Sequence, residues 1–545
     1  MSLRKLKGGL ASTLALILPL ALALGLSACR KDDGGTSSGY DTGSLNILAG
    51  SEIQDLEPLR PQMEAAAGMP IKFTYSGSIA AVESLEDGAT PDAVWLSHGK
   101  YLQQTPALKP RIKASERTMA SPVVLGVKRS KAKALGWDTK DPTWGEVAKA
   151  AASGKLNYAM TSPSSSNTGF TALVGIAAAL AGTGDALSAK DIKSAELANL
   201  FKGQKFIAGS SGWLADSFAS KQDSLDGMIN YESVILQLNK SATLREPLVL
   251  VYPKEGIVTA DYPLMLMNEA KREAYTKLVA FLRAPQTQAQ IGRDTLRRPV
   301  VAGVAANPLI PQKELIELPF PASRKTMDDL LDAYQERLRR PASTYFVLDT
   351  SGSMRGEGMS QLKAAIADIA GGDASLTGRF TKLQPREKVF MQPFSDVLGA
   401  PLSLTMPAAE SASLSASSDS SAPAASAALT PVRAFGQSLQ AEGGTAIFTA
   451  LKFAYQKALE DKAREPDRQY GIVLMTDGKN AEGLSADAFE KWHAKLSQPS
   501  IPVFVVLFGA ASEDELAPIA EATGGRVFDG RKGLRAAFKQ IRGYL

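Results

Sequence analysis

The sequence predicts an α/β protein with two folded domains in one chain. Short apolar stretches typical of buried strands alternate with amphipathic stretches of helical length, first over residues 45–320 and again from residue 342 onward. A Pro-rich run that ends at Pro321 separates the two regions. At 545 residues, with 44% hydrophobic and 21% charged residues, the chain has an ordinary globular composition and is long enough for two large domains.

The charge pattern argues against a nucleic-acid partner. The formal net charge of +5 is small for this length and is spread along the chain. Nucleic-acid-binding surfaces usually carry a basic stripe with interleaved aromatic residues, and the sequence has none. We therefore expect no binding to nucleic acid.

The first residues have the pattern of a secretory signal peptide. Arg4, Lys5 and Lys7 precede an uncharged apolar run over residues 8–26. No later stretch reaches the roughly 18 apolar residues that a membrane span needs. We therefore predict export, with a signal peptide over residues 1–28.

A lipid anchor is predicted at the end of this segment. The run ends in LSAC, residues 26–29, and Cys29 is the only cysteine of the chain. LSAC resembles the bacterial lipobox, which implies cleavage before Cys29 and a lipid on its thiol. Two or three acyl chains, at about 0.8 kcal/mol per buried CH₂, hold a protein at a membrane where one does not. The alternative is a plain signal peptide with an incidental thiol. Residues 29–44, rich in Gly, Ser, Thr and Asp, are predicted to form a flexible tether.

The first domain is predicted over residues 45–322. Apolar stretches predict strands at LNILAG (45–50), IKFTYSG (71–77), DAVWLS (92–97), SPVVLGV (121–127), KLNYAMTSP (155–163), SLDGMINYES (224–233) and REPLVLVYP (245–253). Helices are predicted at WGEVAKAAASG (144–154), FTALVGIAAALAG (170–182) and in two pieces over 271–293, broken near Pro285. This alternation of strands and helices predicts a parallel sheet.

A helix is predicted to link the two domains over residues 323–341. Met327, Leu330, Leu331, Tyr334 and Leu338 form an apolar stripe at helical spacing, and a proline follows at residue 341.

The second domain is predicted over residues 342–545 as a doubly wound fold. Its strands are expected at TYFVLD (344–349), KVFMQPFSD (388–396), YGIVLMTDG (470–478), IPVFVVLFG (501–509) and GRVFDG (525–530). Residues 406–430 consist almost entirely of Ala, Ser and Pro without periodicity, which predicts a disordered surface insertion.

The segment DTSGSM (349–354) directly follows the first strand of this domain, where ligands bind in doubly wound folds. Asp349, Ser351 and Ser353 are oxygen donors at alternate positions. Thr445 at a helix start and Asp477 after a later strand are further candidates. Hard divalent cations such as Mg²⁺ prefer such oxygen ligands.

These motifs resemble the metal-ion-dependent adhesion site of von Willebrand factor type A domains: DxSxS, a threonine in a GGT loop, and TDG after an apolar strand. The resemblance covers residues 342–545. It implies a Mg²⁺ or Mn²⁺ site at Asp349, Ser351, Ser353, Thr445 and Asp477, with one coordination position open for a carboxylate of a protein partner. The distance from Ser353 to Thr445 exceeds the family's usual spacing, and the predicted insertion accounts for the excess.

A catalytic role is not predicted. The chain has two histidines, His98 and His493, and neither lies in a metal-ligand or triad pattern. It carries no P-loop or HExxH motif, and its GxSxG match, GTSSG at residues 35–39, lies in the predicted tether and not between a strand and a helix. Both histidines are expected to serve in packing or on the surface.

The first domain resembles the two-lobed extracellular solute-binding proteins of ABC importers. The resemblance rests on LAGS, YSGSIAAVESLEDGATPDAVWLS and YAMTSPSSSNTGFTAL, and the middle stretch is similar to the molybdate and sulfate binders. Hydroxyl-rich turns at helix starts suit an oxyanion. The candidate ligand contacts are Ser51, Ser78, Ser164, Ser165, Ser166, Asn167 and Thr168, with Tyr231 and Glu232 on the opposite wall.

Other interpretations of the cleft remain open at this stage. Each Ser, Thr or Asn at a helix start can serve as a cap alone. The Glu232 carboxylate opposes a bare oxyanion, and the domain can have kept its two-lobed shape without a small ligand. The sequence thus predicts a membrane-anchored, exported lipoprotein, facing the outside of the cytoplasmic membrane, that binds a protein partner through Mg²⁺. The alternative is a solute-capture lipoprotein whose second domain docks it to a complex.

Overall fold

The computed structural model describes residues 40–182, 187, 192, 195–409, 427–496, 501–509, 511, 513–532 and 534–542. The predicted signal peptide, Cys29 and most of the tether lie outside these residues, as do residues 410–426 of the predicted insertion. Residues from Tyr40 onward form one compact unit by their contacts. Within the described part, no helix is both long enough and apolar enough to cross a bilayer.

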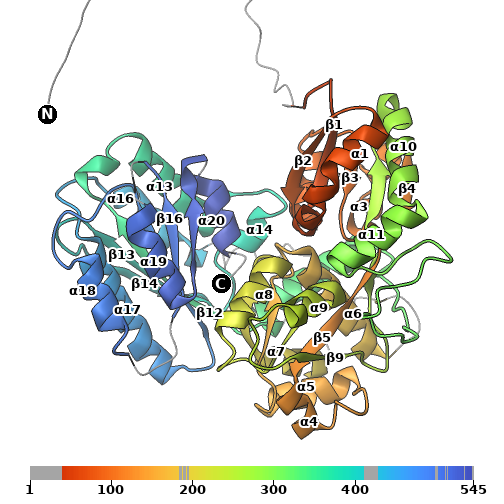
Figure 1. Cartoon of the computed structure of the whole chain (residues 1–545). Coiled ribbons are helices and arrows are strands. Elements are labelled where there is room, and N and C mark those ends of the chain that lie inside the picture. The colour runs from red at the N-terminus through yellow and green to blue at the C-terminus, as the bar shows by residue number, and fades with distance from the viewer. Residues whose placement is uncertain are drawn as a thin grey trace, which may run out of the picture. The chain divides into compact units, whose positions relative to one another are not determined.

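The N-terminal domain consists of two lobes, each built on its own sheet (Figure 1). The first sheet has the order β2-β1-β3-β11-β4. Its strands are β1 (Leu45–Gly50), β2 (Ile71–Ser76), β3 (Ala93–Trp95), β4 (Ala114–Arg117) and β11 (Pro263–Leu266). Its helices are η1 (Ser51–Leu59), α1 (Arg60–Ala67), α2 (Ser78–Glu86), α3 (Lys100–Gln103), η2 (Lys109–Arg111), η4 (Glu269–Lys271), α10 (Arg272–Leu282) and α11 (Pro285–Thr295). We call this part lobe 1.

Lobe 2 is built on a sheet with the order β10-β5-β8-β6-β7, in which β9 also pairs with β5. Its strands are β5 (Ser121–Lys128), β6 (Tyr158–Thr161), β7 (Gln204–Ala208), β8 (Gly227–Tyr231), β9 (Leu248–Val251) and β10 (Thr259–Ala260). Its helices are α4 (Arg129–Leu135), α5 (Trp144–Ala152), α6 (Asn167–Ala181), α7 (Ala195–Lys202), α8 (Ser211–Ser220) and α9 (Glu232–Lys240).

The prediction of a parallel sheet in this domain was wrong, because both sheets are mixed. β1 pairs in parallel with β2 and β3, but β11 runs antiparallel to β3 and β4. In lobe 2, β5 is antiparallel to β8, β9 and β10. The chain passes between the lobes at residues 118–120 and 261–262, so strands far apart in sequence enter each sheet from the opposite direction.

A helical segment follows the N-terminal domain, formed by α12 (Arg324–Ala333) and the π-helical turn η5 (Tyr334–Leu338), and we call it the connecting helix. The Ser323 hydroxyl caps its start by accepting from the Thr326 N–H. The apolar stripe predicted from the sequence is buried, and Met327, Leu330 and Leu331 belong to the same core cluster as the N-terminal lobes. The connecting helix therefore adds to the core of the first domain.

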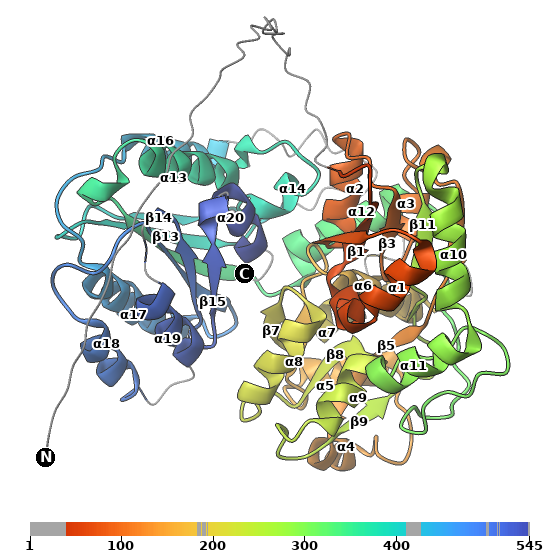
Figure 2. The same ribbon diagram turned by 45° about the horizontal axis from the view of Figure 1, so that its top comes forward.

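The C-terminal domain is a six-stranded sheet with the order β14-β13-β12-β15-β16-β17, parallel except for β14 (Figure 2). The strands are β12 (Ala342–Asp349), β13 (Lys388–Phe394), β14 (Leu402–Thr405), β15 (Gln469–Thr476), β16 (Val503–Leu507) and β17 (Arg526–Asp529). The helices are η6 (Gly352–Met354), α13 (Glu357–Ala367), η7 (Asp368–Gly372), α14 (Gly378–Thr381), α16 (Thr430–Ser438), α17 (Ile447–Arg464), α18 (Ala486–His493), α19 (Glu513–Thr523), η8 (Gly530–Lys532) and α20 (Leu534–Arg542).

Helices cover both faces of this sheet, as the doubly wound prediction requires. Alternate residues of β12 point to opposite faces, so Phe346 and Leu348 pack with α13, α16 and α20, whereas Tyr345 and Val347 pack with α17, α18 and α19. All eight residues of β12 are buried. The carboxyl end of this strand, at Asp349, thus lies at a rigid edge of the sheet.

Candidate metal site and inter-lobe cleft

The loop after β12 holds the Asp349 carboxylate in a fixed orientation. Oδ1 of Asp349 accepts a 2.8 Å hydrogen bond from the Ser351 N–H, and Oδ2 accepts one of 2.6 Å from the Thr476 hydroxyl. Asp349 is 0% exposed. A buried carboxylate with both oxygens bonded is well positioned to bind a cation.

The two serines of DTSGSM lie between Asp349 and Asp477, which directly follows β15. The hydroxyls of Ser351 and Ser353 lie 3.0 Å apart, and the Ser353 hydroxyl donates a 2.8 Å hydrogen bond to Oδ1 of Asp477. Burial raises the pKa of Asp477, and the neighbouring Asp349 carboxylate raises it further. Two carboxylates at one place favour a cation between them.

Thr445 reaches the same place from a third loop. The Gly352 N–H donates to the Gly443 carbonyl at 3.0 Å, which joins DTSGSM to the GGT loop. A β-carbon placed on Gly478 would lie 3.6 Å from Ser353 Oγ and 3.9 Å from Thr445 Oγ1, so both hydroxyls flank this glycine. The structure therefore brings together all five side chains that the sequence predicted.

This donor set suits a hard cation. Within the described residues, no group of three or more His, Cys, Asp or Glu side chains could hold a metal. The present cluster has two carboxylates and three hydroxyls, a set of oxygen atoms of the kind that Mg²⁺ accepts together with water. The residues thus fit a divalent cation by their chemistry.

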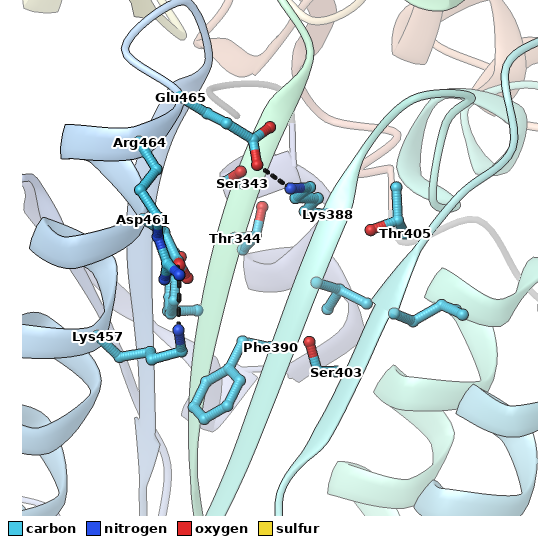
Figure 3. A pocket seen from close by; sticks show the side chains of 13 residues that line it. Ser343, Thr344, Lys388, Phe390, Ser403, Thr405, Lys457, Asp461, Arg464 and Glu465 are labelled. Carbon is cyan, nitrogen blue, oxygen red and sulfur yellow. Dashed lines mark hydrogen bonds and ion pairs between the residues drawn. The ribbon is translucent and has the colours of Figure 1, made fainter.

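A separate hollow of about 300 Å³ lies between β12–β14 and the end of α17 (Figure 3). It is lined by the first residues of β12, at the end of the strand away from Asp349. Its charged side chains pair with one another, Lys388 with Glu465 and Lys457 with Asp461. We assign no role to this hollow.

In the N-terminal domain, Asn167 joins the two lobes. It is the first residue of α6 in lobe 2, and its Oδ1 accepts from the N–H and the hydroxyl of Ser78 in lobe 1, at 2.5 and 2.6 Å. Its Nδ2 donates to both carboxylate oxygens of Glu52 in lobe 1, at 2.9 and 3.0 Å. We call this set of hydrogen bonds the inter-lobe latch.

Glycines allow the lobes to approach closely at the latch. A β-carbon on Gly77 would lie 2.3 Å from the Ser165 carbonyl oxygen, and one on Gly50 would lie 2.8 Å from Asn167 Nδ2. Such distances leave no room for a side chain, so the lobe 1 backbone lies directly against the lobe 2 backbone at Gly77 and against the Asn167 amide at Gly50.

The other predicted cleft residues lie near the latch but differ in their contacts. Ser51 begins η1, and Ser166 precedes α6 without capping it through its side chain. The hydroxyl of Ser164 accepts from Gln335 of the connecting helix at 3.0 Å. Ser165 Oγ is buried without a partner among the described residues, and Thr168 is 1% exposed.

Glu232 does not present a free carboxylate to a ligand. Arg298 binds it through two hydrogen bonds of 2.7 Å, and the Tyr252 hydroxyl also donates to it. Glu232 is 0% exposed. The objection that its charge would repel an oxyanion is therefore removed by this buried ion pair.

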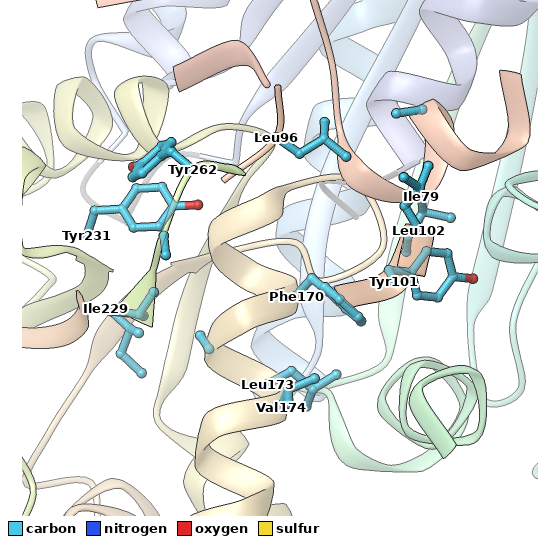
Figure 4. Close-up of a cluster of buried hydrophobic side chains, with 14 of the residues drawn as sticks. Ile79, Leu96, Tyr101, Leu102, Phe170, Leu173, Val174, Ile229, Tyr231 and Tyr262 are labelled. Carbon is cyan, nitrogen blue, oxygen red and sulfur yellow. The ribbon is translucent and has the colours of Figure 1, made fainter. Parts of the chain in front are cut away.

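Further polar residues lie at the cleft that the sequence did not indicate. The Tyr262 ring centroid lies 6.1 Å from that of Tyr231 (Figure 4) and 4.8 Å from the Arg297 guanidinium carbon. Tyr231 Oη, Tyr262 Oη, Ser97 Oγ and Arg297 Nε are buried and make no hydrogen bond of regular geometry among the described residues, although Ser97 lies beside Tyr231 and Arg297 beside Tyr262. Burial raises the pKa of Tyr231 and of Tyr262, so both phenols are neutral donors.

Tyr262 also has an unusual backbone conformation. Its φ is +44°, in the left-handed region that few residues other than glycine adopt, and it lies where the chain passes from β10 in lobe 2 to β11 in lobe 1. Strained backbone of this kind occurs mostly at functional sites and hinges.

The two histidines serve in packing, as expected. The His98 ring stacks on Phe320 at 4.1 Å, and burial lowers its pKa to about 3. His493 Nε2 lies 3.0 Å from the Tyr455 hydroxyl, and burial lowers its pKa.

Comparison with known proteins agrees with this architecture. The family model for bacterial extracellular solute-binding proteins matches residues 45–294, and that for the von Willebrand factor type A domain matches residues 410–536. The second match begins after DTSGSM, so Asp349, Ser351 and Ser353 lie outside it. No curated protein matches the chain.

Several solved structures resemble the N-terminal domain. The periplasmic binding protein AfuA from Actinobacillus pleuropneumoniae, with fructose-6-phosphate bound, is 16% identical, with 55% of this chain and 99% of that chain covered and a TM-score of 0.43. The ferric binding protein from Campylobacter jejuni is 14% identical, with coverages of 54% and 98% and a TM-score of 0.40. The sulfate-binding protein SubI from Mycobacterium tuberculosis H37Rv is 19% identical, with coverages of 48% and 88% and a TM-score of 0.38.

The ligands named for these three proteins are fructose-6-phosphate, ferric iron and sulfate, so the likeness says nothing about the ligand of this chain. Both family models and the mixed α/β architecture agree on the domain types. The chain therefore combines a domain of the bacterial extracellular solute-binding protein family with a C-terminal von Willebrand factor type A domain.

Proposed function

We propose that the chain is an exported, lipid-anchored binding protein whose C-terminal domain captures a protein partner through a divalent cation, Mg²⁺ or Mn²⁺. The observation that carries this proposal is the convergence of Asp349, Ser351, Ser353, Thr445 and Asp477 at the carboxyl ends of β12 and β15. The role is one of binding, since the side chains at this place are cation ligands and include no base poised to activate a nucleophile.

A bound cation would supply positive charge at the edge of the sheet, where a partner carboxylate completes its coordination. The chain's own residues orient this site. The Thr476 hydroxyl and the Ser351 N–H fix both oxygens of Asp349, and Ser353 fixes Asp477. Such fixed oxygens lower the ordering cost of binding.

Titration of Mg²⁺ into the full-length chain, purified in detergent, tests this proposal by calorimetry. The wild type should bind about one Mg²⁺ with saturation, and Asp349→Ala should abolish that binding. Unchanged Mg²⁺ binding by Asp349→Ala, in a chain with wild-type circular dichroism, would contradict the proposed site.

The second candidate function is capture of a small solute in the N-terminal cleft. It is favoured by the buried polar atoms of Ser97, Tyr231, Tyr262 and Arg297, which make no hydrogen bond of regular geometry within the described chain, since buried donors normally find a well-placed acceptor. A thermal-shift panel on the full-length chain, with oxyanions, sugars and short peptides, tests it. A ligand at 100 times its dissociation constant adds about 2.7 kcal/mol to stability.

A further inference from the structure

The connecting helix crosses from one lobe to the other. It contacts lobe 1 near its start, where Arg324 pairs with Glu86 of α2 at 2.6 Å and the Tyr101 hydroxyl donates to Asp328 at 2.7 Å. It contacts lobe 2 near its end, where Tyr334 donates to Gln204 at 3.1 Å and Gln335 donates to Ser164 at 3.0 Å. Any hinge motion between the lobes must therefore break contacts at one end of this helix.

The same helix continues into the strand that carries Asp349. Arg339, which follows η5, forms a buried ion pair with Glu387, and Arg542 of α20 binds the other oxygen of Glu387 at 2.7 Å. Glu387 is 1% exposed. β12 then begins at Ala342 and ends at Asp349. A displacement of the connecting helix is thus passed to the C-terminal domain in two ways. It follows the chain into β12, and it acts through a charged cluster, costly to break, that joins Arg339 to the start of β13 and to α20.

The C-terminal domain also contacts both lobes directly. Thr377 donates to Glu83 of α2 in lobe 1 at 2.5 Å, and Lys539 of α20 lies 3.7 Å from Glu83 and 2.7 Å from Asp373. On lobe 2, the Trp213 ring meets that of Phe504 on β16 edge to face, with centroids 6.5 Å apart. The domain therefore spans the hinge as a second bridge.

Helix α2 joins the inter-lobe latch to this bridge. Its first residue, Ser78, binds Asn167 across the cleft, and Glu83 and Glu86 of the same helix bind the C-terminal domain and the connecting helix. Ile79, Val82 and Leu85 anchor the helix in the core of lobe 1. A short, anchored helix moves as a rigid body, so the latch and the bridge cannot change independently.

We infer that closure of the N-terminal lobes and cation binding at Asp349 are coupled: the latched, closed lobes hold the C-terminal domain in the state that binds the cation, and opening them weakens that binding. The coupling works in both directions, because effects on binding are reciprocal. A solute that closes the lobes would thereby promote capture of the protein partner. This inference rests on the proposed function of the C-terminal site.

The test measures the Mn²⁺ dissociation constant of the full-length chain by electron paramagnetic resonance. Asn167→Ala removes the latch and should raise this constant about fivefold or more, a typical size for coupling between sites. Asn239→Ala is the matched control. This variant likewise removes a side-chain amide, but the two hydrogen bonds of Asn239 are both to Leu248 within lobe 2. It should leave the Mn²⁺ dissociation constant unchanged.

The path is tested by repeating Asn167→Ala in a chain that also carries Glu83→Ala, Tyr334→Phe and Gln335→Ala. These changes remove both contacts of Glu83 with the C-terminal domain and both hydrogen bonds of the connecting helix with lobe 2. The effect of Asn167→Ala on Mn²⁺ binding should then fall within about twofold, the limit of additive behaviour. An unchanged effect in this background overturns the path.

Two outcomes separate this inference from the function on which it rests. If the wild type binds no Mn²⁺, the proposed metal site is wrong. If the wild type binds Mn²⁺ and Asn167→Ala binds it equally well while remaining folded by circular dichroism, the metal site stands and the coupling is wrong.

Discussion

The Ser353 hydroxyl donates a 2.8 Å hydrogen bond to the Asp477 carboxylate, and the two residues are 124 positions apart in the chain. This bond closes the gap between the loops after β12 and β15, which are neighbours in the sheet. It places a second carboxylate beside Asp349, and among the described residues no basic side chain forms a hydrogen bond or ion pair with either carboxylate. The local geometry is therefore set for a cation.

The first prediction concerns stability with and without metal. Mg²⁺ at 100 times its dissociation constant should raise the free energy of unfolding by about 2.7 kcal/mol, because it binds only the folded chain. Asp349→Asn should abolish this increase and should not lower the stability of the metal-free chain, since it removes one of two repelling carboxylates. Thermal unfolding with and without Mg²⁺ measures both effects. An equal Mg²⁺ effect in the variant would exclude Asp349 as a ligand.

The second prediction concerns pH. The pKa of Asp477 is raised in the folded chain. At a pH above this raised pKa, the ionised carboxylate therefore lowers the free energy of unfolding. This loss disappears when the pH falls below the raised pKa and Asp477 takes up a proton. A cation binds the ionised form, so Mg²⁺ should displace a proton, and its affinity should fall as the pH is lowered through the raised pKa. Calorimetric titrations in buffers of different ionisation enthalpy count the protons. Proton release that is the same in Asp477→Asn would contradict this assignment.

The third prediction concerns the buried pair of Glu232 and Arg298. Arg298→Ala leaves the Glu232 carboxylate buried without its partner, and we expect a loss of about 3–5 kcal/mol. The control is Arg245→Ala, whose partner Asp223 is largely exposed, and it should leave stability nearly unchanged. Urea unfolding of the two variants compares them. Equal losses of unfolding free energy in the two variants would mean that burial does not set the strength of the pair between Glu232 and Arg298.

The fourth prediction concerns the contact between the lobes at Gly77. Gly77→Ala introduces a β-carbon 2.3 Å from the Ser165 carbonyl oxygen, so the lobes must separate or the backbone must shift, at about 1–3 kcal/mol. Small-angle scattering should show a larger radius of gyration. Gly212→Ala, in α8, has open space around the new carbon and should leave scattering and stability unchanged.

The fifth prediction concerns the anchor. Cys29→Ser removes the thiol that would carry the lipid, so the chain should move from the membrane fraction to the soluble fraction after export. Fractionation followed by immunoblotting measures this shift. A chain that stays with the membrane after the substitution would contradict anchoring through Cys29.

The convergence of the five candidate ligands could be predicted because its signal is local. DTSGSM, GGT and TDG each follow a strand or precede a helix, and the carboxyl ends of neighbouring parallel strands meet at one edge. The strands β12, β13, β15 and β16 were recognisable because each is a largely buried, largely apolar run, whereas in β17 the apolar signal is confined to Val527 and Phe528.

The cleft and the sheet direction in the N-terminal domain were not predictable in the same way. β10 has two residues and β11 has four, and the antiparallel pairing of β11 depends on where the chain returns from lobe 2. Tyr262 and Arg297 reach the cleft through contacts with residues far away in the sequence, such as Asp55. No local sequence pattern marks such residues. The adjacent arginines Arg297 and Arg298 are the one local feature that could have drawn attention to this segment.

The burial of the connecting helix has a practical consequence for any experiment that divides the protein. Met327, Leu330, Leu331 and Tyr334 fill the core of the N-terminal lobes, although they follow the Pro-rich run that looks like a boundary. An N-terminal fragment that ends at Pro321 would expose the apolar surface that these side chains cover, and it would be expected to aggregate. A fragment that ends after Leu338 keeps this surface covered. The connecting helix is thus part of the N-terminal core and also leads directly into the C-terminal domain. A chimera that transfers either domain to another protein must include this helix.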